Sequence, residues 1–119
     1  MENAAFEELI LKYISELPAK FRQGLKNIDV IVDYENYSHR DSSEIKPSEI
    51  TLGLYQGLPN TEKPGHYRNI PDIITIYKKS LESVSANDEE LSKNLKRVLL
   101  HEVGHYFGMD EKKLRELGY

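Results

Sequence analysis

His101, Glu102 and His105 are the residues of this 119-residue chain whose types and spacing could do chemistry. On a helix, residues four apart project from the same face, so the two imidazoles could bind one metal ion from the same side. Glu102 follows the first histidine directly and could reach a water molecule on that metal without being a ligand. Zinc would lower the pKa of this water and polarise a carbonyl, while Glu102 takes the proton and delivers it to the leaving amine. The pattern predicts metal-assisted hydrolysis.

The third metal ligand must come from elsewhere in the chain, because a catalytic zinc usually has three protein ligands and one open position. Gly108 follows His105 by three residues and allows the chain to turn, and Asp110 and Glu111 come immediately afterwards. The spacing from His101 to Glu111 is that of a longer zinc motif, so Glu111 is the predicted third ligand. Asp110 is the competitor, although it is also a favourable N-cap for a short last helix. Glu111 in turn suits the first turn of such a helix, with or without a metal.

The stretch His-Glu-Val-Gly-His-Tyr-Phe-Gly-Met-Asp-Glu, residues 101–111, resembles the bacterial minimal zincin-like metallopeptidase family. The likeness extends over most of the second half of the chain, through residues 52–59, 71–77 and 114–118. It implies a compact α+β fold with a small mixed sheet of about three to four strands and an active-site helix. It also implies zinc held by the two histidines and an acidic residue after Gly108, with Glu102 as general base. The family motif usually carries Asp where this chain has Glu111, so Asp110 and Glu111 both stay candidates.

The elements before the motif are predicted from hydrophobic spacing. Apolar residues recur at helical intervals in residues 3–16, which predicts an amphipathic helix. Residues 28–34 and 73–77 are rich in β-branched residues and predict strands. Residues 51–56 hold Leu52, Leu54 and Tyr55 and predict a further short strand. Helices packed on one face of a small sheet are the expected arrangement.

The motif itself falls on a helix that its own end signals predict. Asn87 is a good N-cap, and Glu90 three residues later completes a pair that resembles a capping box. Apolar residues then continue at helical spacing as far as Phe107, where Gly108 can close the helix in the left-handed conformation. Asp110 is expected to cap a last helix that contains Leu114 and Leu117.

Composition limits the class of protein. The length fits a single domain over residues 1–119. A formal net charge of −4 argues against a general binder of nucleic acid or of anionic membranes. The absence of cysteine excludes thiol catalysis, a cysteine-based zinc site and disulfides. No apolar run approaches the roughly 20 residues of a membrane span, and the N-terminus lacks signal-peptide character, so a cytoplasmic protein is expected.

The function predicted from these residues is zinc-dependent peptide hydrolysis through a zinc-activated water, with peptides or unfolded proteins as substrates. The chain lacks a second subdomain to wall a cleft, so substrates are expected to be short or unfolded, or a partner subunit completes the site. The strand around Leu54 and Tyr55 could pair with an extended peptide. His66, Tyr67 and Tyr106 are lesser candidates for contact with the site.

Two alternatives use the same residues. In the first, the protein is a metal-binding or protein-interaction module without turnover. In the second, zinc has a structural role and holds the last helix against the rest of the chain, with all four coordination positions filled by protein groups. Manganese, iron or nickel could also occupy these ligands, because affinity order alone does not select zinc.

Overall fold

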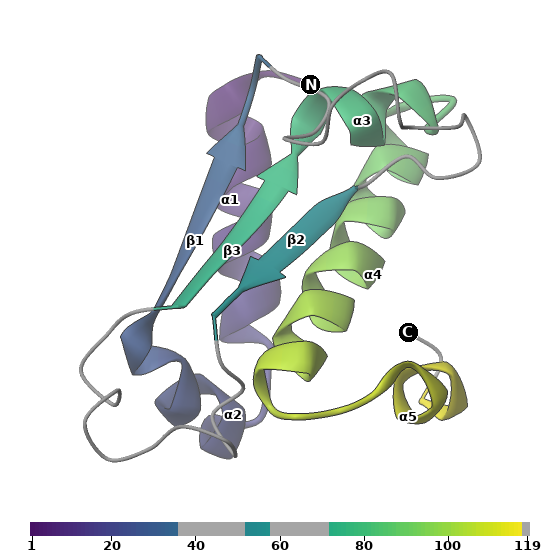
Figure 1. Cartoon of the computed structure of the whole chain (residues 1–119). Coiled ribbons are helices and arrows are strands. Elements are labelled where there is room, and N and C mark those ends of the chain that lie inside the picture. Colours follow the sequence, from purple (N-terminus) through teal and green to yellow (C-terminus); the bar gives the residue numbers. More distant parts are fainter. Residues whose placement is uncertain (36–51, 58–71, 118–119) are drawn as a thin grey trace.

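The computed structural model describes residues 1–35, 52–57 and 72–117, and the fold over these ranges is α+β (Figure 1). Its strands are β1 (Ile28–Asp33), β2 (Gly53–Gln56) and β3 (Asp72–Tyr77), and its α-helices are α1 (Asn3–Ser15), α2 (Ala19–Gly24), α3 (Lys78–Ser83), α4 (Asp88–Tyr106) and α5 (Glu111–Glu116). A 3-10 turn, η1 (Leu25–Asn27), joins α2 to β1.

The three described strands form one mixed sheet in the order β1-β3-β2. β3 lies in the centre, parallel to β1 and antiparallel to β2. The expected small mixed sheet is therefore confirmed, and the predicted strands differ from the observed ones by a residue or two at their ends. β2 stands at one side of the sheet with α4 beside it, and its outer edge pairs with no other described strand (Figure 1).

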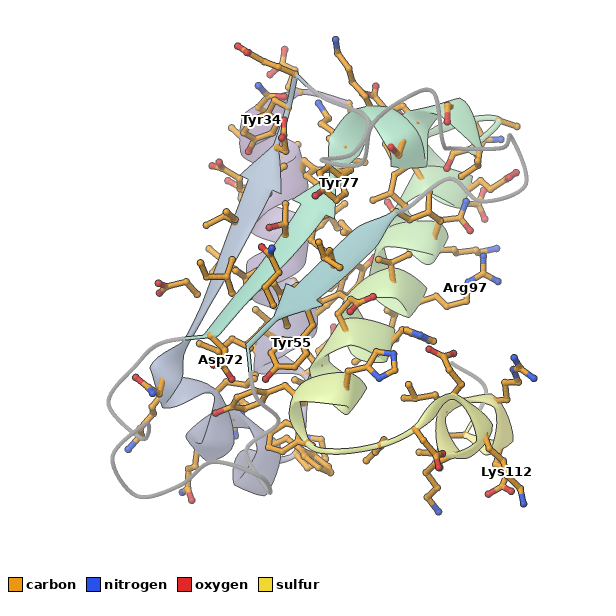
Figure 2. The ribbon with its side chains drawn as sticks, viewed as in Figure 1. Tyr34, Tyr55, Asp72, Tyr77, Arg97 and Lys112 are labelled. Carbon is orange, nitrogen blue, oxygen red and sulfur yellow. The ribbon has the colours of Figure 1, made fainter. Side chains whose placement is uncertain are left out.

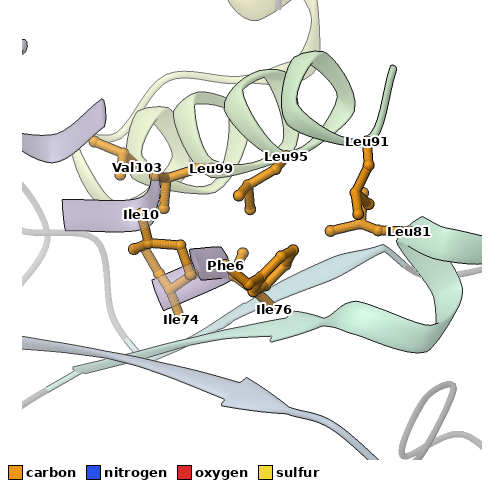
Figure 3. Packing of buried hydrophobic residues seen from close by; sticks show 9 residues of the cluster. All are labelled: Phe6, Ile10, Ile74, Ile76, Leu81, Leu91, Leu95, Leu99 and Val103. Carbon is orange, nitrogen blue, oxygen red and sulfur yellow. The ribbon is translucent and has the colours of Figure 1, made fainter. Parts of the chain in front are cut away.

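The core lies between the sheet and the helices α1 and α4 (Figure 3). The side chains of Ile74 and Ile76 on β3 are fully buried there, since alternate residues of a strand face the same side. α4 contributes a stripe of leucines at intervals of four residues, Leu91, Leu95 and Leu99, none of them more than 3% exposed. Burying each such side chain stabilises the fold by about 1.5–3 kcal/mol. This stripe fixes which face of α4 points away from the core.

The end signals of α4 act as the sequence indicates. The Asn87 side chain accepts a hydrogen bond from the Glu90 N–H at 2.9 Å and satisfies one of the free donors of the first turn. At the other end Gly108 has φ of 81°, a left-handed conformation that glycine adopts at little cost. The Asp110 carboxylate accepts from the Lys113 N–H at 2.8 Å and so caps α5, as predicted.

Two helices were not predicted from the sequence. α2 begins directly after Pro18, and α3 follows β3 without a connecting loop. Each has only six residues, which is under two turns and too short to display a helical period of apolar residues. None of the helices in the described ranges combines the length and apolar character that crossing a membrane requires.

Candidate metal centre

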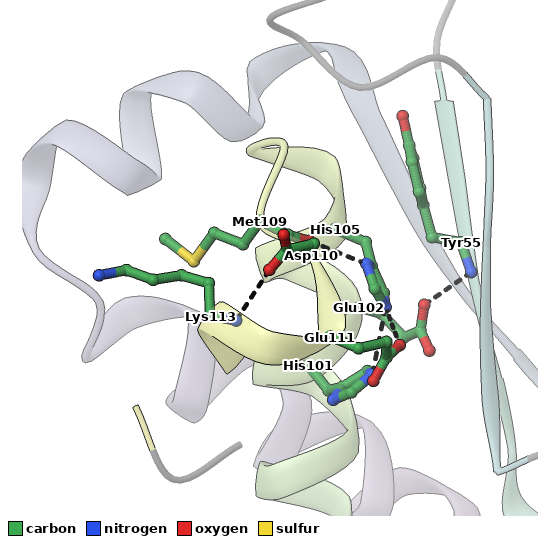
Figure 4. A network of polar contacts seen from close by, with 8 residues as sticks. All are labelled: Tyr55, His101, Glu102, His105, Met109, Asp110, Glu111 and Lys113. Carbon is green, nitrogen blue, oxygen red and sulfur yellow. Dashed lines mark hydrogen bonds and ion pairs between the residues drawn. The ribbon is translucent and has the colours of Figure 1, made fainter. Parts of the chain in front are cut away.

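Three ligand atoms converge at the C-terminal end of α4 (Figure 4). His101 Nε2 and His105 Nε2 lie 3.2 Å apart, and Glu111 Oε1 lies 3.2 Å from the first and 2.9 Å from the second. Glu111 comes from the start of α5, so both helices contribute to the cluster. Among the described residues, these three side chains form a group that could hold a metal ion.

The turn between α4 and α5 brings Glu111 back over the histidines. The Met109 N–H donates to the Gly104 carbonyl at 3.0 Å, which closes the end of α4 around the left-handed Gly108. α5 then packs on α4 through Leu114, which is fully buried. A Cβ atom at Gly104 would lie 2.3 Å from Leu114 Cδ2, so the close approach of the two helices depends on glycine at this position. Sequence and packing thus place the acidic residue on the same side of α4 as His101 and His105.

The tautomer of His105 follows from its second contact. His105 Nδ1 lies 3.1 Å from the Met109 carbonyl oxygen, and a carbonyl oxygen can only accept, so Nδ1 carries the proton and donates. In the neutral ring Nε2 then presents a lone pair toward His101 and Glu111. A backbone carbonyl on the far nitrogen is a common way to fix the orientation of a metal-binding histidine. The Met109 carbonyl was not found from the sequence, because a backbone group has no residue-type signal.

The donor set fits a zinc ion. With its Nδ1 protonated, a neutral His105 offers Nε2 as an acceptor only 2.9 Å from Glu111 Oε1, another acceptor, so a proton or a cation has to lie between these two atoms. Ligand atoms about 2.0–2.2 Å from a tetrahedral zinc lie about 3.3–3.6 Å from each other, slightly longer than the separations of 2.9 to 3.2 Å in this cluster. Slight burial acts to raise the pKa of Glu111, but hydrogen bonds and charges from His101 and His105 outweigh it, so the pKa is lowered overall.

The two acidic candidates occupy different places. Glu111 stands with the histidines, whereas the Asp110 carboxylate is engaged in capping α5 and is not part of the group. Both residues nevertheless line one cleft, which opens at the C-terminal end of α4.

Glu102 lies beside the cluster and points toward β2. Its Oε2 accepts a hydrogen bond from the Tyr55 backbone N–H at 2.9 Å (Figure 4). Burial raises the pKa of the Glu102 carboxyl above its ordinary value, although His105, His101 and the Tyr55 N–H act in the opposite direction. A partly buried carboxylate beside a possible metal site is suited to accept a proton from water.

A cleft of about 540 Å³ opens over these residues. Its walls are the end of β2, the exposed side of α4 and the turn into α5, with lining residues Leu54, Tyr55, Gly57, His101, Glu102, His105, Gly108, Met109, Asp110 and Glu111. The four residues predicted to take part in the chemistry and the competing candidate Asp110 therefore line one cleft. The ligand group is open to this cleft, since the Glu111 side chain is 57% exposed.

The lesser candidates for contact with the site were Tyr106, His66 and Tyr67. Tyr106 is 2% exposed and donates its hydroxyl to the Gly24 carbonyl at 2.8 Å, so it supports the packing and does not line the cleft. His66 and Tyr67 lie outside the described residues.

Comparison with known proteins agrees with this geometry. The family model described as "Zincin-like metallopeptidase" matches residues 25–119. Among solved structures, the chain is similar to a conserved hypothetical protein (TTHA0227) from Thermo thermophilus, with a TM-score of 0.63 and 23% identity over 90% of this chain and 94% of the other. At that identity the likeness shows the fold alone. No curated protein matches the chain. Because the family model covers most of its length, including the whole candidate metal centre, the chain belongs to the zincin-like metallopeptidase family.

Proposed function

We propose that this protein is a zinc-dependent peptidase, with His101, His105 and Glu111 as the metal ligands and Glu102 as the general base. The observation that carries the proposal is that the side chains of His101, His105 and Glu111 converge in one open cleft. A second carboxylate, that of Glu102, lines the same cleft and is not part of the group. Bound zinc would lower the pKa of a water molecule and polarise the scissile carbonyl.

The residues of the chain account for the proton transfers. Glu102 accepts a proton as the water oxygen bonds to the carbonyl carbon, and gives it to the amide nitrogen as the carbon–nitrogen bond breaks. The products are a free acid and a free amine. Glu102 lines the same cleft as His101, His105 and Glu111, and it makes its hydrogen bond to β2 rather than to these three side chains.

Three protein ligands favour a catalytic over a structural zinc. A structural site usually fills all four positions with protein groups, whereas a catalytic site keeps one open. Among the described residues, three side chains that could hold a metal ion lie together in a group that opens to a cleft, which supports this proposal. The outer edge of β2, which borders this cleft, suits an extended peptide, and an open cleft suits short or unfolded chains.

The test combines metal content with turnover. Mass spectrometry of untagged protein should find about one zinc per chain, lost in His101→Ala and weakened in Glu111→Ala. Glu102→Gln should keep its zinc and lose about 10²–10⁴-fold in turnover of an unstructured peptide. Glu116→Gln, an exposed residue of α5, is the matched control and should behave as wild type.

Two outcomes would contradict the proposal. A chain that takes up no metal after incubation with zinc has no such site. A metal-loaded protein whose peptide turnover is unchanged in Glu102→Gln would instead be a metal-binding module, with any turnover coming from another source.

A further inference from the structure

The hydrogen bond between Glu102 and the Tyr55 backbone joins two parts of the chain that are 47 residues apart. β2 pairs with β3 on one side, where the Leu52 carbonyl accepts from the Tyr77 N–H at 3.0 Å. Backbone groups of successive residues point to opposite edges of a strand, so the Tyr55 N–H leaves the sheet at the outer edge of β2. A donor at that edge would ordinarily bind water or an incoming strand, and here it binds Glu102.

The side chain of Tyr55 is held by two contacts, one at its hydroxyl and one at its ring. Its hydroxyl donates to Asp72 Oδ2 at 2.7 Å, and Figure 2 shows the two side chains together at the ends of their strands. Its ring packs edge-on against Tyr106, with centroids 5.9 Å apart, and the Tyr106 hydroxyl is bound to the Gly24 carbonyl. Asp72 is 4% exposed, so the hydroxyl contact is shielded from solvent. The backbone of Tyr55 therefore has little freedom to move relative to α4.

The hydrogen bond from the Tyr55 N–H engages only one of the two carboxylate oxygens of Glu102, Oε2. Within the part of the chain that the structure describes, Glu102 Oε1 has no hydrogen-bond partner. A hydrogen bond from a backbone N–H to a carboxylate is charge-assisted, and it restrains the carboxylate without placing a second titratable side chain beside the base. A general base has to be held within hydrogen-bond reach of its proton to be effective.

We infer that Tyr55 is a positioning residue, whose backbone N–H fixes one oxygen of Glu102 so that the other is presented to the cleft. The inference rests on the proposed function and deepens it. The Tyr55 side chain contributes indirectly, because its contacts with Asp72 and Tyr106 hold that N–H in place. A second consequence concerns the substrate, which cannot use the Tyr55 N–H while Glu102 occupies it and must pair with other backbone groups of the β2 edge.

The first experiment tests the hydrogen bond without any turnover. Amide hydrogen exchange of Tyr55 is measured by NMR in wild type, Glu102→Ala and the control Glu116→Ala. Loss of a hydrogen bond to a charged group should speed exchange of the Tyr55 amide by about tenfold or more in Glu102→Ala alone. Equal exchange rates in all three proteins would show that Glu102 is not held by Tyr55, and would overturn the inference.

The second experiment tests the role in catalysis. Tyr55→Pro removes both the side chain and the N–H, whereas Tyr55→Ala removes the side chain and keeps the N–H. Proline is tolerated at the edge of a sheet when its nitrogen faces away from the ladder. We expect kcat to be about tenfold lower in Tyr55→Pro than in Tyr55→Ala, with KM within about twofold and equal zinc content. Equal kcat values, or a difference confined to zinc content, would overturn the positioning role.

The two experiments separate this inference from the proposed function. A wild-type protein with zinc but without turnover would overturn the proposed function and the catalytic role of Tyr55 together. The exchange measurement would still decide whether Glu102 is held at the sheet edge. If Tyr55→Pro fails to fold, the exchange result decides the inference.

Discussion

Gly53 and Val98 approach so closely that a Cβ atom at Gly53 would lie 2.6 Å from Val98 Cγ1. Val98 is β-branched and stiff at χ1, so it cannot easily turn aside. Gly53→Ala should therefore destabilise the fold by about 1–3 kcal/mol and move β2 away from α4. Urea denaturation measures the first effect. An alanine in a strand is ordinarily more stable than glycine, and a variant as stable as wild type would contradict the close packing.

Asp110 and Glu111 should differ in what their loss affects. Asp110→Ala removes the cap of α5 and should cost about 1 kcal/mol of stability, with zinc affinity nearly unchanged. Glu111→Ala should weaken zinc by more than about tenfold, because its carboxylate lies within 3.2 Å of both histidines. Chelator competition and thermal unfolding measure the two effects, and Asp110→Asn, which retains a cap, is the control. Loss of zinc in Asp110→Ala with retention in Glu111→Ala would exchange the two assignments.

The leucine stripe of α4 should be sensitive to truncation. Leu95 is fully buried between α1 and the sheet, so Leu95→Ala leaves a cavity and should cost about 2–5 kcal/mol. Leu11 on α1 is 68% exposed, and Leu11→Ala should change stability by less than about 0.5 kcal/mol. Equal effects in chemical denaturation would show that the core is not where the structure places it.

The Tyr34 hydroxyl should lose its proton at an unusually high pH. Burial, followed by the hydrogen bond to Glu7 at 2.5 Å and the charge of that carboxylate, raises its pKa to about 12. An unfolded chain would release this proton near pH 10. Between about pH 10 and 12 the unfolded state therefore binds fewer protons than the folded state, and stability falls as pH rises through this window.

Glu7→Gln should lower the pKa of Tyr34 toward its ordinary value and narrow that window. The 13Cζ shift of Tyr34 followed by NMR against pH measures the change. Glu8→Gln, an exposed neighbour on the same helix, is the control. A Tyr34 pKa that is the same in both variants would show that Glu7 has no part in the shift.

The motif helix is the part of the structure that could best be predicted from sequence. Its cap at Asn87 and its end at Gly108 are local signals, decided by a few neighbouring residues. The strands were also predictable, because β1 and β3 are β-branched segments and β2 carries the apolar residues Leu54 and Tyr55, and such patterns are short-range.

The contacts that hold the candidate site could not be predicted in the same way. The hydrogen bond from Tyr55 to Glu102 uses a backbone N–H, which every residue except proline possesses, across 47 residues of sequence. Which of Asp110 and Glu111 lies with the histidines depends on where the turn at Gly108 and the packing of Leu114 on Gly104 direct α5. Spacing alone allows both acids, and three-dimensional packing separates them.

The central position of β3 has a consequence for the order in which the chain can fold. Ile28 of β1 pairs with Asp72 of β3, so the first strand must wait for a partner synthesised much later. The other described strand, β2, also pairs only with β3. Since α4 follows β3 closely in sequence, the sheet and the helix that carries the histidines become able to form within the same short interval of synthesis. Until then the apolar face of α1 has no sheet to cover it, and parallel pairing between distant strands makes folding slow.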